Sequence, residues 1–135
     1  MIELTAVLVI MAIAGAVVIT RLSNNNADVL GQAAVVKSHI HFAQMMAMKS
    51  NVPWGIRFTS TSYTLQKNGA TSTVFFPSEG SPTHSMPSGI TLTFNTNPLV
   101  FDQWGSPGTG NVTVRITKGA ASIIITVRKN TGLVS

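Results

Sequence analysis

The pattern of apolar positions divides the 135-residue chain into an apolar helix, an amphipathic helix and a β-rich remainder. The opening stretch, MIELTAVLVIMAIAGAVVIT, has no charge and only Thr5 as a polar residue between Leu4 and Ile19. At about 1.5 Å per residue, a helix of this length approaches the hydrocarbon thickness of a bilayer. The pattern therefore predicts a membrane-spanning or polymerisation helix over residues 1–22.

Apolar residues then recur every three or four positions, which predicts that the helix continues over residues 23–50 with one buried stripe. The stripe consists of Val29, Ala33, Val36, Ile40, Ala43 and Ala47. We expect the helix to end in Ser50-Asn51-Val52-Pro53, because proline disfavours helical geometry at the residue before it.

From Trp54 the period changes to two, which predicts an antiparallel β head over residues 51–135. The expected strands cover residues 54–59, 63–67, 72–77, 90–94, 99–101, 112–117 and 122–128. Asn68-Gly69 predicts a tight hairpin turn between the second and third strands. Residues 78–89, rich in serine, proline and glycine, predict a loop. The fold class is therefore α+β, with a long N-terminal helix packed on an antiparallel sheet.

The packing of helix on sheet is expected to centre on Ile40 of the stripe. Alternation places several apolar residues of the last hairpin on one face, and Ile40 should pack against them. These residues are Val112, Val114, Ile116 and Ile125.

Glu3 is the one charged residue among the first twenty, and a carboxylate beside an apolar helix is costly unless it finds a partner. Three interpretations of the apolar stretch compete. A cleaved signal peptide fits badly, because no basic region precedes the apolar run. A plain membrane anchor fits the length but gives Glu3 no role. The third is a helix that rests in the membrane and later packs among copies of itself.

The run Ile2-Glu3-Leu4, followed by an apolar helix that contains Gly15, resembles the N-terminus of type IV pilins and type II secretion pseudopilins. Gly55-Ile56-Arg57-Phe58 and the run from Val100 to Gly105 are similar to the GspH/FimT-type members. The resemblance implies a type IV pilin-like fold and a structural subunit of a pilus-like or pseudopilus filament. It also implies that Glu3 neutralises the N-terminal amine of a neighbouring subunit, since two buried opposite charges are tolerable only together. The residues implied to pack in the filament core are Leu4, Val7, Leu8, Met11 and Gly15.

The same resemblance implies the partners and the location of the chain. The partners are copies of itself and other pilins or pseudopilins, the bacterial inner membrane before assembly, and the pilus or secretion assembly machinery. The head would lie in the periplasm, and the assembled filament would be periplasmic or extracellular. Because the family opens with Phe-Thr-Leu-Ile-Glu-Leu, we expect the native protein to carry residues before Met1, beginning with a methylated Phe. Major and minor subunits, and pilus and pseudopilus, are equally compatible with the sequence.

The charge distribution supports a second hypothesis. Nine bases stand against four acids, and the chain from Gly105 onward contains four bases and no acid. These bases are Arg115, Lys118, Arg128 and Lys129. A minor pilin could bind DNA for uptake through them, with an affinity that falls steeply with salt. The Gly-Arg-x-Arg ending of DNA-binding FimT-type members is missing, so this hypothesis ranks below a filament subunit in which the bases form a solvated strand face.

Candidate chemistry is sparse elsewhere. The absence of cysteine excludes disulfides and thiolate metal sites. His39 and His41 are two apart on a helix and point to different faces, and His84 stands alone in the expected loop. No carboxylate pair and no nucleophile-elbow motif occurs. We therefore predict no enzyme activity, no cofactor and no metal site. Met45, Met46 and Met48 are predicted to fill the core.

Overall fold

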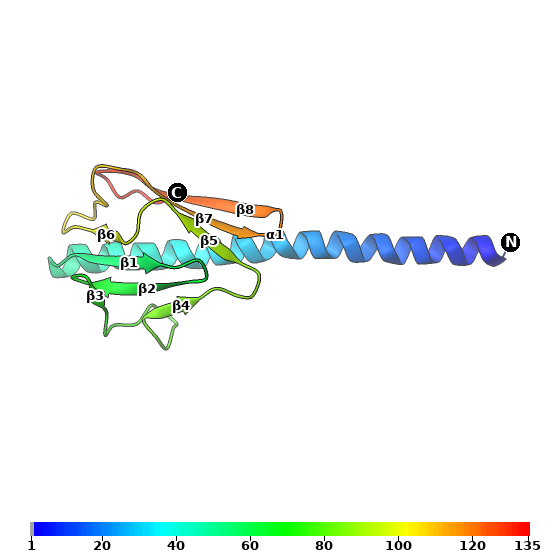
Figure 1. The fold of residues 1–135 in the computed structure, drawn as a ribbon, viewed down its shortest axis with the longest axis horizontal. Coiled ribbons are helices and arrows are strands. Elements are labelled where there is room, and N and C mark those ends of the chain that lie inside the picture. Colours follow the sequence, from blue (N-terminus) through cyan, green and yellow to red (C-terminus); the bar gives the residue numbers. More distant parts are fainter. Residues whose placement is uncertain (1) are drawn as a thin grey trace.

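The computed structural model describes the backbone of residues 2–135 and the side chains from Asn25 onward. A single helix, α1 (Ile2–Ser50), forms the long axis of the molecule, and its first half projects beyond the strands (Figure 1). The helix expected over residues 1–22 and its expected continuation over residues 23–50 are thus one uninterrupted element. Where side chains are described, no helical segment is long and apolar enough to span a membrane. The apolar stretch of residues 4–19 lies outside that part of the chain.

The predicted stripe of α1 is confirmed, because each of its six residues is at most 3% exposed. These residues pack in one core with the strands of the head, and α1 contacts β1, β6, β7 and β8. The helix ends where expected. Asn51 adopts a left-handed conformation with φ of 54°, a common helix stop, and Pro53 follows two residues later. Trp54 then donates from Nε1 to the Ser50 hydroxyl at 2.8 Å.

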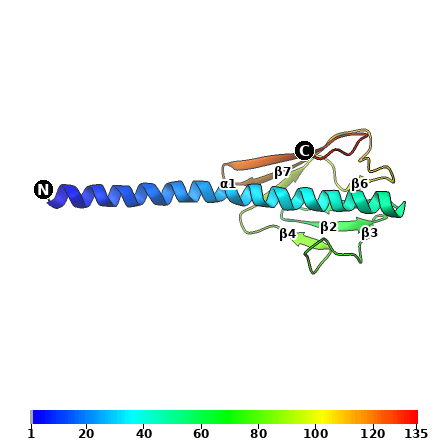
Figure 2. The same cartoon turned by 180° about the vertical axis from the view of Figure 1, so that it is seen from behind.

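The head contains two antiparallel sheets, and α1 runs in front of both when the molecule is seen from behind (Figure 2). The first consists of β1 (Trp54–Phe58), β2 (Ser62–Lys67), β3 (Ala70–Thr71), β4 (Thr83–Ser85) and β6 (Leu99–Phe101). Its order is β3-β2-β1-β6, and β4 also pairs with β2. The expected hairpin turn is confirmed: Asn68 and Gly69 both have positive φ, at 53° and 83°.

Two predictions at the edge of this sheet were wrong. Residues 72–77 were expected to form a strand, but the strand after the turn, β3, ends at Thr71. Strand β4 forms inside the segment that was expected to be a loop, residues 78–89. The chain leaves the sheet because Phe76 turns inward: its side chain is 1% exposed and its ring stacks on that of His39, with centroids 4.2 Å apart. The chain then returns as β4, so two short strands share one edge of β2.

The second sheet consists of β5 (Thr91–Phe94), β7 (Val112–Lys118) and β8 (Ala121–Val127), in the order β5-β7-β8. Strands β7 and β8 form the expected hairpin, in which Val114 pairs with Ile125. Both side chains are fully buried, and they belong to the same core cluster as Ile40 of α1. The core between this sheet and the helix is therefore built from apolar side chains.

Candidate functional site

The residues proposed for assembly lie on the projecting half of α1 (Figure 1). They are Glu3, Leu4, Val7, Leu8, Met11 and Gly15. The structure gives their helical backbone, whereas their side chains fall outside the described residues. Their roles therefore stay predictions.

The junction between the projecting half and the head is held by an ion pair. Lys118, at the end of β7, donates from Nζ to Oδ2 of Asp28 on α1 at 2.6 Å. Both side chains are partly exposed, so the pair contributes at most about 1 kcal/mol. Its geometric consequence is clearer: the β7–β8 turn is tied to the helix, and Lys118 is already paired with a carboxylate.

The four bases proposed for DNA do not form one patch. Lys118 stands at the turn end of the β7–β8 hairpin, while Arg128 follows Val127 at the other end. Seven residues of strand separate the two ends, which is about 23 Å. Arg115 is exposed and lies between them, on the face of β7 opposite to its buried residues. Lys129 is exposed beyond the end of β8. This spread gives the DNA-binding hypothesis no support.

A junction around Gln44 was missed by the sequence analysis. Gln44 lies off the apolar stripe, but its side-chain amide donates to the Gly105 carbonyl at 2.8 Å and to the Gly132 carbonyl at 3.0 Å. One side chain thus joins the helix, the loop after β6 and the C-terminal turn. Gly132 has φ of 71°, and a Cβ at this position would lie 1.9 Å from the Gly105 oxygen. Only glycine therefore permits this close approach of the two backbones.

Three exposed apolar side chains surround this junction, at the end of α1 remote from the N-terminus. Trp104 is 77% exposed, Leu133 is 59% exposed and Met48 is 47% exposed. Each belongs to one of the three segments that Gln44 joins, and Met48 touches Gly105, the neighbour of Trp104. We call these three residues the distal patch. Exposed tryptophan and methionine are enriched at protein interfaces, so the patch is a candidate contact surface.

The predicted burial of the methionines was therefore wrong for two of them. Met46 packs against the core, but Met45 and Met48 are about half exposed. Met45 and Met48 lie off the buried stripe of α1, so their side chains point away from the core.

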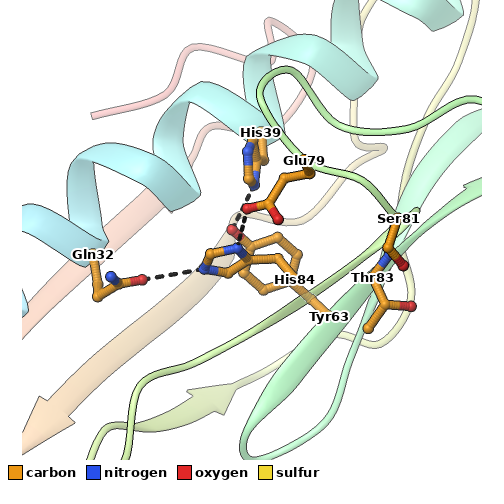
Figure 3. A network of polar contacts seen from close by, with 7 residues as sticks. All are labelled: Gln32, His39, Tyr63, Glu79, Ser81, Thr83 and His84. Carbon is orange, nitrogen blue, oxygen red and sulfur yellow. Dashed lines mark hydrogen bonds and ion pairs between the residues drawn. The ribbon is translucent and has the colours of Figure 1, made fainter.

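A polar cluster connects α1 to the edge of the first sheet (Figure 3). His39 of α1 hydrogen-bonds through Nδ1 to the Tyr63 hydroxyl at 2.7 Å. His84 of β4 hydrogen-bonds through Nδ1 to Glu79 at 2.5 Å, and its Nε2 lies 3.2 Å from Oε1 of Gln32. The prediction that His84 stands alone was wrong, because the return of the chain as β4 carries it back to the helix.

The protonation of this cluster follows from its partners. Each ring nitrogen of His84 has an oxygen partner, Glu79 at Nδ1 and Gln32 at Nε2, so the ring is held in a fixed orientation. Burial lowers the pKa of His39, and the nearby His84 lowers it further, against the opposing effects of Glu79 and the Pro77 carbonyl. Burial likewise raises the pKa of Tyr63. His39 and Tyr63 are therefore both neutral near pH 7.

Comparison with known proteins places this fold among pilins and pseudopilins. The family model described as "Type II transport protein GspH" matches residues 32–131. The minor pseudopilin EpsH from the Type 2 Secretion System of Vibrio cholerae has a similar structure, with a TM-score of 0.64 at 12% identity, over 80% of this chain and 94% of that one. The type IV minor pilin FimU of Pseudomonas aeruginosa gives a TM-score of 0.61 at 12% identity, over 81% of this chain and 87% of that one. Curated protein sequences yield no match.

Proposed function

Because this chain belongs to the GspH family of type II transport proteins, we propose that it is a structural subunit of a type II secretion pseudopilus or a type IV pilus-like filament. The observation that carries the proposal is the shape of the molecule. Helix α1 is continuous from Ile2 to Ser50, and its first half projects beyond the strands of the head (Figure 1). An apolar helix that extends from a folded head has surface available for packing against other copies.

The life cycle that we propose has two stages. Before assembly, the apolar helix holds the subunit in the bacterial inner membrane with its head in the periplasm. During assembly, the pilus or secretion machinery lifts the subunit out, and the helix packs among other pilin or pseudopilin helices. The transfer exchanges one apolar environment for another, so the apolar surface of the helix stays away from water at both stages.

Glu3 is proposed to set the stagger between neighbouring helices. In the filament core its carboxylate would neutralise the N-terminal amine of an adjacent subunit. A charge without a partner in an apolar environment is strongly unfavourable, so the correct axial position is favoured over its alternatives. The distal patch would contact a neighbouring head or another pilin at the opposite end of the subunit.

The test is an assembly assay in the source cells. Glu3→Ala should yield a protein that inserts in the membrane at normal abundance but is depleted from the sheared filament fraction. Thr5→Ala is the matched control, since it removes a polar group from the same helix without removing the charge. Trp104→Ala should leave the head folded and reduce incorporation, whereas Thr109→Ala, at an exposed position of the same loop, should not. Normal incorporation of Glu3→Ala would contradict the pairing role.

A further inference from the structure

The cluster between α1 and β4 has the composition of a transition-metal site. One ring nitrogen of His39, one of His84 and a carboxylate oxygen of Glu79 lie within 4.8 Å of one another. Figure 3 shows the three side chains converging, with the Tyr63 hydroxyl beside them. The ligands come from α1, from the segment between β3 and β4, and from β4. From this convergence we propose that the head binds a zinc-class divalent cation through His39, Glu79 and His84.

The donor set selects the class of ion. Two imidazole nitrogens and one carboxylate suit Zn²⁺ and neighbouring transition metals, whereas Ca²⁺ and Mg²⁺ prefer sites built from oxygen alone. Three protein ligands leave a fourth tetrahedral position, which water would occupy. Tyr63 is not the fourth ligand, because the raised pKa keeps its hydroxyl protonated. Binding of the ion to Nδ1 of His39 would displace the hydrogen bond between that nitrogen and the Tyr63 hydroxyl.

The surroundings orient the ligands as they do in metal sites. The Nε2 of His84 faces Gln32, so its Nδ1 points at Glu79 and the centre of the cluster. A polar partner on the outer nitrogen of a histidine ligand is a general feature of metal centres. His39 is neutral and 2% exposed, so its ring is held in a fixed position, and its Nδ1 would exchange the Tyr63 hydroxyl for the ion.

An ion can reach the cluster from solvent, and the ligand side chains can rearrange around it. The side chains of His84 and Glu79 are 12% and 27% exposed, which leaves a path to solvent on one side. Tetrahedral bonds of about 2.1 Å place ligand atoms about 3.4 Å apart. The His84 and Glu79 atoms, now 2.5 Å apart, must therefore separate by about 1 Å, while separations near the upper limit of 4.8 Å must shorten by about 1 Å. Glu79 belongs to the irregular segment between β3 and β4, where a change of rotamer requires no change in the sheet.

Metal binding exchanges an ion for a proton. The proton between His84 and Glu79 leaves, and the ion takes its place between the same two atoms. Affinity should therefore fall as the pH is lowered, because protons compete with the ion for the same ligand atoms. The bound ion would fasten the segment that carries Phe76 to the helix. Metal binding and its effect on this segment do not depend on the proposed role of the chain in a filament.

The test uses the full chain in detergent micelles, stripped with a chelator and titrated with ZnCl₂ by calorimetry. We expect one Zn²⁺ per chain, with a rise in the midpoint of thermal unfolding that MgCl₂ does not reproduce. His84→Gln and Glu79→Gln should abolish this binding, and Gln32→Ala should weaken it about tenfold. His41→Ala is the matched control, because His41 is an exposed histidine two residues from His39.

A second readout makes the result independent of folding differences between variants. Co²⁺ loaded in place of Zn²⁺ should give the visible absorption of a tetrahedral ion in the wild type and in His41→Ala, and lose it in His84→Gln. Circular dichroism of each variant would establish that its head is folded. Zinc binding that is absent from the wild type, or that persists unchanged in a folded His84→Gln, would overturn the proposal.

Discussion

Gln44 of the helix donates its side-chain amide to the carbonyl of Gly132, 88 residues later, at 3.0 Å. The same amide binds the Gly105 carbonyl at 2.8 Å, so three distant segments share one donor group. This arrangement makes the C-terminal turn part of the head, although it lies outside every strand.

Replacing Gln44 with Ala should therefore lower the free energy of unfolding of the full chain by about 1–3 kcal/mol, because two part-buried carbonyls lose their donor. Denaturant titration in detergent micelles measures this change. Met45→Ala alters the adjacent, half-exposed position and should cost less than about 0.5 kcal/mol. Equal effects for the two variants would contradict the role of the Gln44 junction.

Two glycine-to-alanine changes should alter the stability of the protein in opposite directions. Gly132→Ala would place a Cβ 1.9 Å from the Gly105 oxygen at φ of 71°, and should destabilise the head by more than about 2 kcal/mol. Gly31→Ala meets no atom within 4 Å on the exposed side of α1, and should stabilise the helix by about 1 kcal/mol. Thermal unfolding followed by circular dichroism would detect both shifts. A tolerated Gly132→Ala would show that the two backbones do not approach so closely.

The core position of Ile40 supports a third prediction. Its side chain is 0% exposed, so Ile40→Asp buries a carboxylate for which the surrounding apolar core provides no partner. The head should lose about 3 kcal/mol or more of stability. His41→Asp introduces the same group at the next, exposed position and should have little effect. A parent-like unfolding midpoint for Ile40→Asp would be incompatible with the packing of α1 on the sheets.

The lowered pKa of His39 predicts a pH dependence of stability. The pKa of His39 in the folded state lies below the ordinary histidine value of 6.5, so the unfolded chain takes up the proton first. Stability should then fall as the pH drops through about 6.5, and level off below the folded pKa. Glu79, His84 and Tyr63 face the same ring, so the measurement compares unfolding of the wild type and of His39→Gln in a chelating buffer. The wild type should lose more stability than the variant on acidification; identical pH profiles would contradict the assignment.

Local patterns predicted the elements of this fold better than their edges. The stripe from Val29 to Ala47 and the β7–β8 hairpin were predicted correctly, because burial on one face imposes a period that the sequence displays directly. The course of residues 72–77 was not predicted correctly, because it depends on the packing of Phe76 against His39 of the helix. Alternation alone cannot distinguish a strand from a segment anchored by one aromatic ring.

The sites show the same limit. Glu3 was proposed because an acid before an apolar helix is unusual on its own, and its role stays a prediction. The cluster of His39, Glu79 and His84 was missed, since its members are brought together by β4, a strand of three residues within a polar loop. The four C-terminal bases were proposed as a single DNA contact, but the hairpin register places Lys118 and Arg128 at opposite ends of the β7–β8 hairpin. Residues that pair across long loops leave no signal in their local spacing.

The most direct test of the central claim is to ask where the protein resides in cells that display filaments. Filaments sheared from the source cells would be purified and analysed by mass spectrometry, with the membrane fraction analysed in parallel. The account predicts that peptides of this chain occur in the filament fraction, and that Glu3→Ala moves them to the membrane fraction. A chain found only in the membrane or soluble fraction, while the same cells carry intact filaments, would contradict it.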